Sequence, residues 1–250
     1  MMFYRAPGEL ESELAEMDEC MPHYYKITGS HGQGAETIMH AEAAFMQGRF
    51  TDAHIALERA YAQIEGNGQE NMALCCDFLA RRLSLFTDIG QRAKLEKRRE
   101  RLLAHHNVSW LNLWNAAAAY HHALLGSTDS IPEAYRRHRL FTVRTLAPGK
   151  PMIEMIENQV YLAQGEYAHV IGRSEGLLTQ CEAMHYALVA LHIRIQTAAA
   201  YEMLGKHGEA RALLERALAD AEPDGFALPF AENFRYLEPL LTERLQDGLT

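Results

Sequence analysis

The 250-residue chain is predicted to be all-α, a solenoid of about five helical hairpins with a helix at each end. Three observations predict this fold. Almost every segment has the apolar spacing of a helix, and none has the sustained alternation with β-branched residues that is typical of strands. Breaks such as "EGNGQ", "LGSTDSIP" and "LGKHG" recur at intervals suited to helical hairpins. One pattern also returns at a nearly constant period.

Residues 1–33 are predicted to form an N-terminal helix, about Glu9 to Met21, and a glycine-rich joint. The stretch "TGSHGQGAE" (28–36) has the glycine content of a phosphate-binding loop. Such a loop requires a preceding strand and, in its nucleotidase form, a closing Gly-Lys-Ser/Thr. Here Ala35 and Glu36 follow Gly34, and the preceding residues do not have a strand pattern. We therefore expect a flexible joint that leads into the first hairpin.

The repeat is clearest in two stretches, residues 41–60 and 198–217, which align without a gap and share the closing "LERA". A third copy covers residues 158–177. The turn glycines Gly48, Gly126, Gly165 and Gly205 are separated by 39 or 40 residues, or by twice 39. This period predicts a repeat region over residues 34–225, with units near 34–67, 68–107, 108–147, 151–182 and 183–222, followed by a C-terminal capping helix over 226–250.

The pattern of small residue, turn glycine, aromatic residue, small residue and final alanine resembles the tetratricopeptide repeat (TPR). This resemblance implies a right-handed superhelix. The turn glycines should adopt the left-handed conformation that ends a helix. Phe50 and Tyr167 should wedge into their hairpins. A period of 39 to 40 exceeds the usual 34, so longer helices are expected.

The sequence contains none of the common signatures of an enzyme. It lacks a G-x-S-x-G elbow and a recognised cysteine nucleophile motif. Its 13 histidines include two adjacent pairs, whose members point to different faces of a helix and form no zinc claw. The four cysteines lack the spacing of a zinc site. The chain is therefore predicted to be non-enzymatic, with no metal and no cofactor.

The concave surface of such a superhelix is mainly lined by the first helix of each hairpin. Aromatic rings with scattered polar groups on that surface suit a small ligand or a peptide. For any single aromatic ring among them, core packing is the favoured alternative. Carrying the repeat register along the chain gives seven candidate ligand-binding residues: Glu42, Phe45, Asp77, Arg81, Tyr120, Gln159 and Glu202.

The net charge of −9 is unevenly distributed, with 13 Lys/Arg against 5 Asp/Glu between residues 80 and 150. A solvated helix face is the favoured interpretation of this basic middle. The alternative is a contact for an acidic partner, with Arg98, Arg99, Arg136 and Arg137 as its candidate residues. The overall acidity and the absence of a long apolar run predict a cytoplasmic protein that binds neither membrane nor DNA directly.

Beyond the repeats, the chain resembles the central helical region of MalT-like, LuxR-type transcription regulators that bind ATP. The resemblance is carried by "YRAPGELE" (4–11), "SHGQGAE" (30–36) running into "HAEAAFMQGRF", and "DGFALPFAEN" (224–233) with "LEPLL" after it. In that family an ATPase module precedes the helical region and a helix-turn-helix follows it. Neither module has a counterpart in these residues, so the resemblance implies an isolated sensor or an excised fragment of a longer regulator.

These observations favour a sensor in which an effector bridges several hairpins and alters self-association. A scaffold that holds a partner peptide or helix in the groove is the alternative. A third interpretation is self-association alone, through the basic middle and an acidic end.

Overall fold

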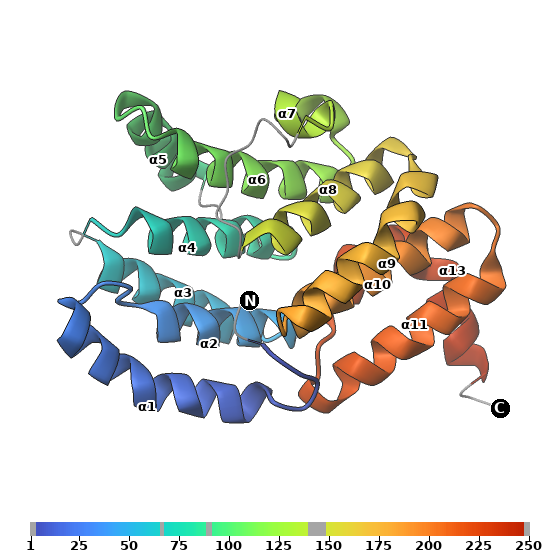
Figure 1. Ribbon diagram of the computed structural model, residues 1–250, viewed down its shortest axis with the longest axis horizontal. Coiled ribbons are helices and arrows are strands. Elements are labelled where there is room, and N and C mark those ends of the chain that lie inside the picture. The colour runs from blue at the N-terminus through green and yellow to red at the C-terminus, as the bar shows by residue number, and fades with distance from the viewer. Residues whose placement is uncertain (1–3, 66–67, 89–91, 140–148, 248–250) are drawn as a thin grey trace.

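The computed structural model describes residues 4–65, 68–88, 92–139 and 149–247. Throughout these ranges every regular element is a helix, so the predicted all-α class is confirmed (Figure 1). None of the described helices is long and apolar enough to span a lipid bilayer.

The helices pair as antiparallel neighbours along most of the chain. The pairs are α2 (Ala35–Met46) with α3 (Phe50–Ile64), α8 (Lys150–Gln164) with α9 (Tyr167–Ala183), and α10 (Ala187–Met203) with α11 (His207–Ala221). Helix α4 (Glu70–Leu83) packs on α3, and α5 (Arg92–Ala104) packs on the helix that follows it. Between them, α6 (Val108–Leu125) is followed by the 3-10 turn η1 (Thr128–Ser130) and the single-turn α7 (Glu133–Arg136). Residues 140–148, in and just after the third predicted unit, lie outside the described ranges.

The first helices of successive units lie against one another, since α2 packs on α4, α4 on α6, α6 on α8, and α8 on α10. The solenoid and its right-handed sense stay predictions. The turn glycines explain the hairpins. Gly48, Gly126, Gly165 and Gly205 all have φ between 71° and 77°, which confirms the expected left-handed conformation. Beside the first turn, Phe50 stacks on Phe86 with ring centroids 5.6 Å apart.

Helix α1 (Leu10–Thr28) continues beyond the predicted end at Met21 and passes through Pro22. A proline inside a helix removes one hydrogen-bond donor and commonly ends or kinks it, which is why the sequence suggested an earlier end. The helix instead ends at Gly29, in the left-handed conformation. Its last turns carry Tyr25, whose hydroxyl accepts a hydrogen bond from the Gly34 N–H at 3.1 Å.

The predicted flexible joint is a turn held by hydrogen bonds. Gly29, Ser30, Gly32 and Gly34 all have positive φ. The Gln69 side chain accepts from the Gly32 N–H at 2.5 Å and donates to the Ser30 carbonyl at 2.8 Å. The glycine content of this stretch therefore serves a tight, left-handed path between α1 and α2.

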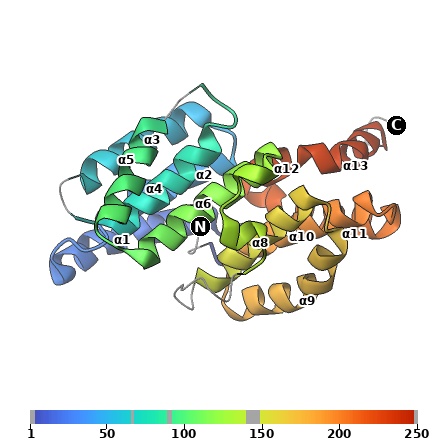
Figure 2. The ribbon, with the colours of Figure 1, turned by 90° about the horizontal axis from the view of Figure 1, so that it is seen from above.

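The residues after α11 form the 3-10 turn η4 (Glu222–Asp224), α12 (Leu228–Glu232) and α13 (Phe234–Asp247). We call residues 222–237 the closing segment. Helix α12 contacts both α2 and α10, so the segment lies between the first and the last hairpin (Figure 2). The predicted capping helix corresponds to α13, whereas α12 enters the inner face.

The closing segment also joins the two ends of the chain. The Asp224 carboxylate accepts hydrogen bonds from the Tyr4 hydroxyl, the Gly8 N–H and the Leu10 N–H, and so caps the start of α1. The Ala227 N–H donates to the Met46 carbonyl at 2.9 Å. As a result, one buried apolar cluster contains residues of the first hairpin, the last hairpin and the closing segment.

Candidate functional site

A cavity of about 490 Å³ opens among α1, α2, α4, α6 and α8. Its size is that of pockets that hold small molecules. Its walls are mostly apolar, and methionine is the most frequent lining residue. The methionines are Met17, Met21, Met39, Met72 and Met152. Because the thioether chain is flexible and polarisable, such walls adapt to ligands of varied shape.

The closing segment covers the inner face beside this cavity. Residues of α2, α4, α6 and α8 that line the cavity lie in the first part of each helix, up to Glu42, Leu79, Ala117 and Ile156. One turn further along, the same helices contact the closing segment. Arg82 and Tyr120 bond to Glu232, and Gln159 donates to Asn233 Oδ1 at 3.0 Å. The inner face is thus divided into an open half and a half covered by the chain itself.

Arg82 is a fully buried charged group at the boundary between the two halves. Its Nε and Nη2 donate to Glu232 at 2.6 and 2.9 Å, in the bidentate geometry that suits a guanidinium and a carboxylate. Burial alone would lower the pKa of Arg82, but Glu232, Tyr120 and Glu42 outweigh it and raise that pKa. Arg82 therefore stays charged.

Aromatic rings surround this guanidinium. The Arg82 Cζ lies 4.9 Å from the ring centroid of Phe45, 5.5 Å from that of Phe78 and 5.7 Å from that of Tyr120. Burial and Glu232 raise the pKa of Tyr120 well above its usual value, so its hydroxyl remains a donor. The third Arg82 nitrogen, Nη1, has no hydrogen-bond partner among the described residues and lies 3.8 Å from Glu42 Oε1.

Of the seven ligand-binding candidates from the sequence, Glu42 lines the cavity. Phe45, Tyr120 and Gln159 are fully buried on the covered half of the inner face. Glu202 lies at the far end of α10, where it accepts from His207 Nδ1 at 2.8 Å. The structure therefore brings Glu42, Phe45, Tyr120 and Gln159 to one face, but it leaves Glu42 alone of these in the cavity wall.

Asp77 and Arg81 point away from that face. The Asp77 carboxylate accepts from the Tyr61 hydroxyl at 2.8 Å and from Arg98, between α3 and α5. The Arg81 Cζ lies 4.5 Å above the ring of Trp114. Their neighbours Phe78 and Arg82 face inward instead, so the register carried into the second unit is displaced by one residue. Few repeat positions match in that unit, which explains the displacement.

Arg98, a candidate for binding an acidic partner, is buried at 7% exposure. It pairs with Asp77 and, at 3.0 Å, with Glu70. The sequence could not distinguish this internal ion pair from a solvated charge run. Arg99 is exposed, with its Cζ 5.5 Å from the Trp114 ring.

The remaining two basic candidates lie on the short α7 and directly after it. Arg136 is half-buried, and its Nη1 donates to the Asp129 carbonyl at 3.5 Å. Arg137 is exposed and pairs with Glu133 at 3.2 Å.

The sequence did not single out α1, Phe78, Arg82 or Glu232 as parts of a site. Met17 and Met21 of α1 are four residues apart and share one helix face, which is a signal that the sequence does contain. Glu232 gave no comparable signal, because an acid inside "LPFAEN" has the appearance of a surface residue.

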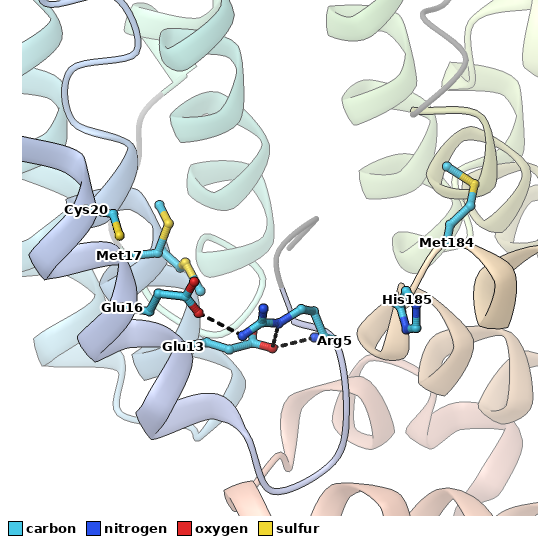
Figure 3. Close-up of a pocket in the computed structure, with 8 residues that line it drawn as sticks. Arg5, Glu13, Glu16, Met17, Cys20, Met184 and His185 are labelled. Carbon is cyan, nitrogen blue, oxygen red and sulfur yellow. Dashed lines mark hydrogen bonds and ion pairs between the residues drawn. The ribbon is translucent and has the colours of Figure 1, made fainter. Parts of the chain in front are cut away.

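A second hollow, of about 360 Å³, adjoins the cavity and shares Met17 and Met39 with it. Figure 3 shows Met17 and Cys20 of α1 on one side and Met184 and His185 on the other. Arg5 pairs with Glu13 at 3.1 Å and with Glu16 at 2.8 Å along its floor. The hollow provides a second opening beside α1.

Among the described residues of the cavity wall, one carries a thiol, Cys75, which is exposed there. Although Cys75 has accessible surface, the side chains around it desolvate the thiolate and so raise the pKa of Cys75 to about 11. The group is therefore a thiol at neutral pH and a weak nucleophile. Within the part of the chain that the structure describes, no three His, Cys, Asp or Glu side chains are grouped to hold a metal ion.

The sequence matches no family model, and it has no significant similarity to a curated protein. The geometry of the cavity and the resemblance in the sequence therefore carry the functional argument.

Proposed function

We propose that the chain is a non-enzymatic, ligand-binding helical domain and the signal-receiving part of a MalT-like, LuxR-type transcription regulator. The single observation that carries the binding proposal is the cavity of about 490 Å³, whose wall is built from α1 and the first helices of four successive units. The assignment to a transcription regulator rests on the sequence resemblance alone.

The proposed mechanism is a shift between two arrangements of the helices. A ligand in the cavity contacts α1 and the first parts of α2, α4, α6 and α8 together, so it favours the arrangement in which they are correctly spaced. That preference would be transmitted to self-association of the domain as a coupling free energy. Sedimentation with and without ligand measures this second step.

Binding is tested by a thermal-shift screen of apolar small molecules, since a ligand that binds only the folded state raises its apparent stability. Alkylation of Cys75, followed by mass spectrometry, then locates the ligand. A compound in the cavity should slow alkylation of Cys75 while leaving that of Cys20 unchanged, because Cys20 lies outside the cavity wall.

A matched pair of variants sharpens the test. Ala117→Met places a longer side chain in the cavity wall and should weaken binding, whereas Ala93→Met lies on an exposed face of α5 and should not. A thermal shift without protection of Cys75 would place the ligand elsewhere. If no compound shifts the melting temperature, the sensor proposal fails.

The alternative is a scaffold that holds a peptide or partner helix in the same apolar groove. The adjoining hollow beside α1 favours this scaffold alternative, because the hollow extends the groove between α1 and residues 184–185. Retention of a purified partner peptide that protects Cys75 would support this alternative.

A further inference from the structure

The cavity and the second hollow adjoin along α1 and α2, because Met17 and Met39 line both of them. Their linings differ in character. The cavity is walled mainly by methionine, aromatic and aliphatic side chains. The second hollow is lined by four charged or imidazole side chains, those of Arg5, Glu13, Glu16 and His185. A molecule that fills both spaces is therefore elongated, with an apolar part joined to a polar part.

The apolar part of such a molecule carries no charge. The described lining residues of the cavity include no lysine or arginine that could neutralise an anion. Glu42 is already engaged, since its Oε1 lies 3.8 Å from Arg82 Nη1 and its charge helps to raise the pKa of Arg82. An ion moved from water into the cavity would lose hydration that the wall does not replace. The flexible methionine side chains can instead adapt to a hydrocarbon chain.

The polar part of the molecule faces side chains that already pair with one another. Arg5 donates from its backbone N–H and its Nε to Glu13 at 2.7 and 3.1 Å, and its Nη2 donates to Glu16 at 2.8 Å (Figure 3). An anionic head would therefore compete with two carboxylates for one guanidinium. A cationic head would gain little from Glu16, whose side chain is 58% exposed and screened by water. Hydroxyl groups, which both donate and accept hydrogen bonds, suit this surface without a charge.

We propose that the ligand is an uncharged single-chain amphiphile, with its hydrocarbon chain in the cavity and a hydroxyl-bearing head in the second hollow. This inference rests on the proposed function, because it names the ligand class of the same cavity. Burial of the chain supplies most of the binding free energy, and the head fixes the direction in which the chain enters.

Four probes test the assignment: 1-O-hexylglycerol, 1-O-octylglycerol, octyl phosphate and butylbenzene. Their dissociation constants are measured by calorimetry at neutral pH, below the concentration at which any of them forms micelles. Each buried methylene adds a factor of about four in affinity, so the octyl ether should bind about fifteenfold tighter than the hexyl ether. Octyl phosphate should bind about tenfold weaker than the octyl ether.

Alkylation of two cysteines, followed by mass spectrometry, locates both parts of the ligand. Cys20 lines the second hollow and Cys75 lines the cavity. Butylbenzene, which has no polar head and is confined to the cavity, should protect Cys75 alone. The amphiphile 1-O-octylglycerol should protect both cysteines.

Two variants of α1 test the place of the head. Glu16→Lys puts a cation in the second hollow, so it should strengthen the binding of octyl phosphate about tenfold and leave the affinity for 1-O-octylglycerol nearly unchanged. Glu11→Lys makes the same change of charge at an exposed position outside the second hollow, and it should keep the wild-type affinities. If Glu16→Lys does not fold, the protection of the cysteines in the wild-type protein still decides the inference.

Protection of Cys75 without protection of Cys20 by 1-O-octylglycerol would overturn the inference and leave the cavity as the binding site. Tighter binding of octyl phosphate than of the octyl ether to the wild-type protein would overturn the uncharged head. If neither these probes nor any compound of the apolar screen binds, the inference and the proposed function fail together.

Discussion

Replacing Glu232 with glutamine should destabilise the protein strongly, because it removes the charged partner of a buried guanidinium. The Glu232 carboxylate has 0% side-chain exposure and the Arg82 side chain 1%. It accepts two hydrogen bonds from Arg82 and a third, at 3.0 Å, from the Tyr120 hydroxyl. The glutamine amide would offer one acceptor oxygen and an NH₂ donor in place of a negatively charged carboxylate that accepts three hydrogen bonds.

Breaking a buried ion pair by removing one partner costs about 3–5 kcal/mol. For a chain of this length each kcal/mol lowers the melting temperature by about 2–4 °C, which gives a fall of roughly 6–20 °C. Urea unfolding followed by circular dichroism measures the free energy, and a thermal melt measures the temperature. The double variant Arg82→Met, Glu232→Leu should lose less than Glu232→Gln, since it removes both charges.

The matched control is Glu215→Gln, which breaks an exposed pair with Arg244 whose Nη1 and Oε1 atoms are 2.7 Å apart. Exposed pairs of this kind are worth about 0–1 kcal/mol. If Glu232→Gln costs no more than Glu215→Gln, Arg82 is hydrated and the reasoning about the closing segment is refuted.

Two further predictions concern the backbone and the dependence on pH. Gly34→Ala should lower the free energy of unfolding in urea by about 1–2 kcal/mol, since Gly34 has φ +91° and an added Cβ would lie 3.3 Å from Ile64. Gly149→Ala, where an added Cβ meets open space, is the control and should be neutral. An equal loss of stability in both variants would contradict the strain argument. Burial and Arg81 lower the pKa of His121 to about 4. Between this pH and the ordinary histidine value near 6.5 the unfolded chain binds more protons, so stability should fall as the pH is lowered through that window. The slope is measured as the free energy of unfolding against pH, and His121→Gln should make it shallower. The same substitution at the exposed His23 should leave the slope unchanged. An unchanged slope in His121→Gln would show that another group titrates in this pH window.

The local part of the fold could be predicted because single residues determine it. The turn glycines fix where hairpins reverse, and small residues such as Ala41 and Ala198, both with 0% exposure, allow the helices to approach closely. The inward register could be carried only where the repeat pattern is dense. In α4 it is sparse, and the displaced residues Asp77 and Arg81 proved to be partners of α5 and α6 side chains.

The candidate site was harder to predict because contacts distant in sequence define it. The pattern gives no reason for Glu232 to lie under Tyr120, 112 residues earlier in the chain. It also does not show that the second half of the inner face is already occupied. The sequence therefore predicts an open groove lined by aromatic and polar residues, whereas of the seven candidates Glu42 alone reaches the part that stays open.

The closing segment has a consequence for how the protein folds during its synthesis. A repeat array ordinarily folds from neighbour to neighbour, and its ends unfold independently. Here the cap on the first N–H groups of α1 is Asp224, 214 residues from Leu10, and the partner of Arg82 is 150 residues away. The early hairpins therefore keep part of their apolar inner surface exposed until the closing segment leaves the ribosome, and the folded domain should unfold as one cooperative unit.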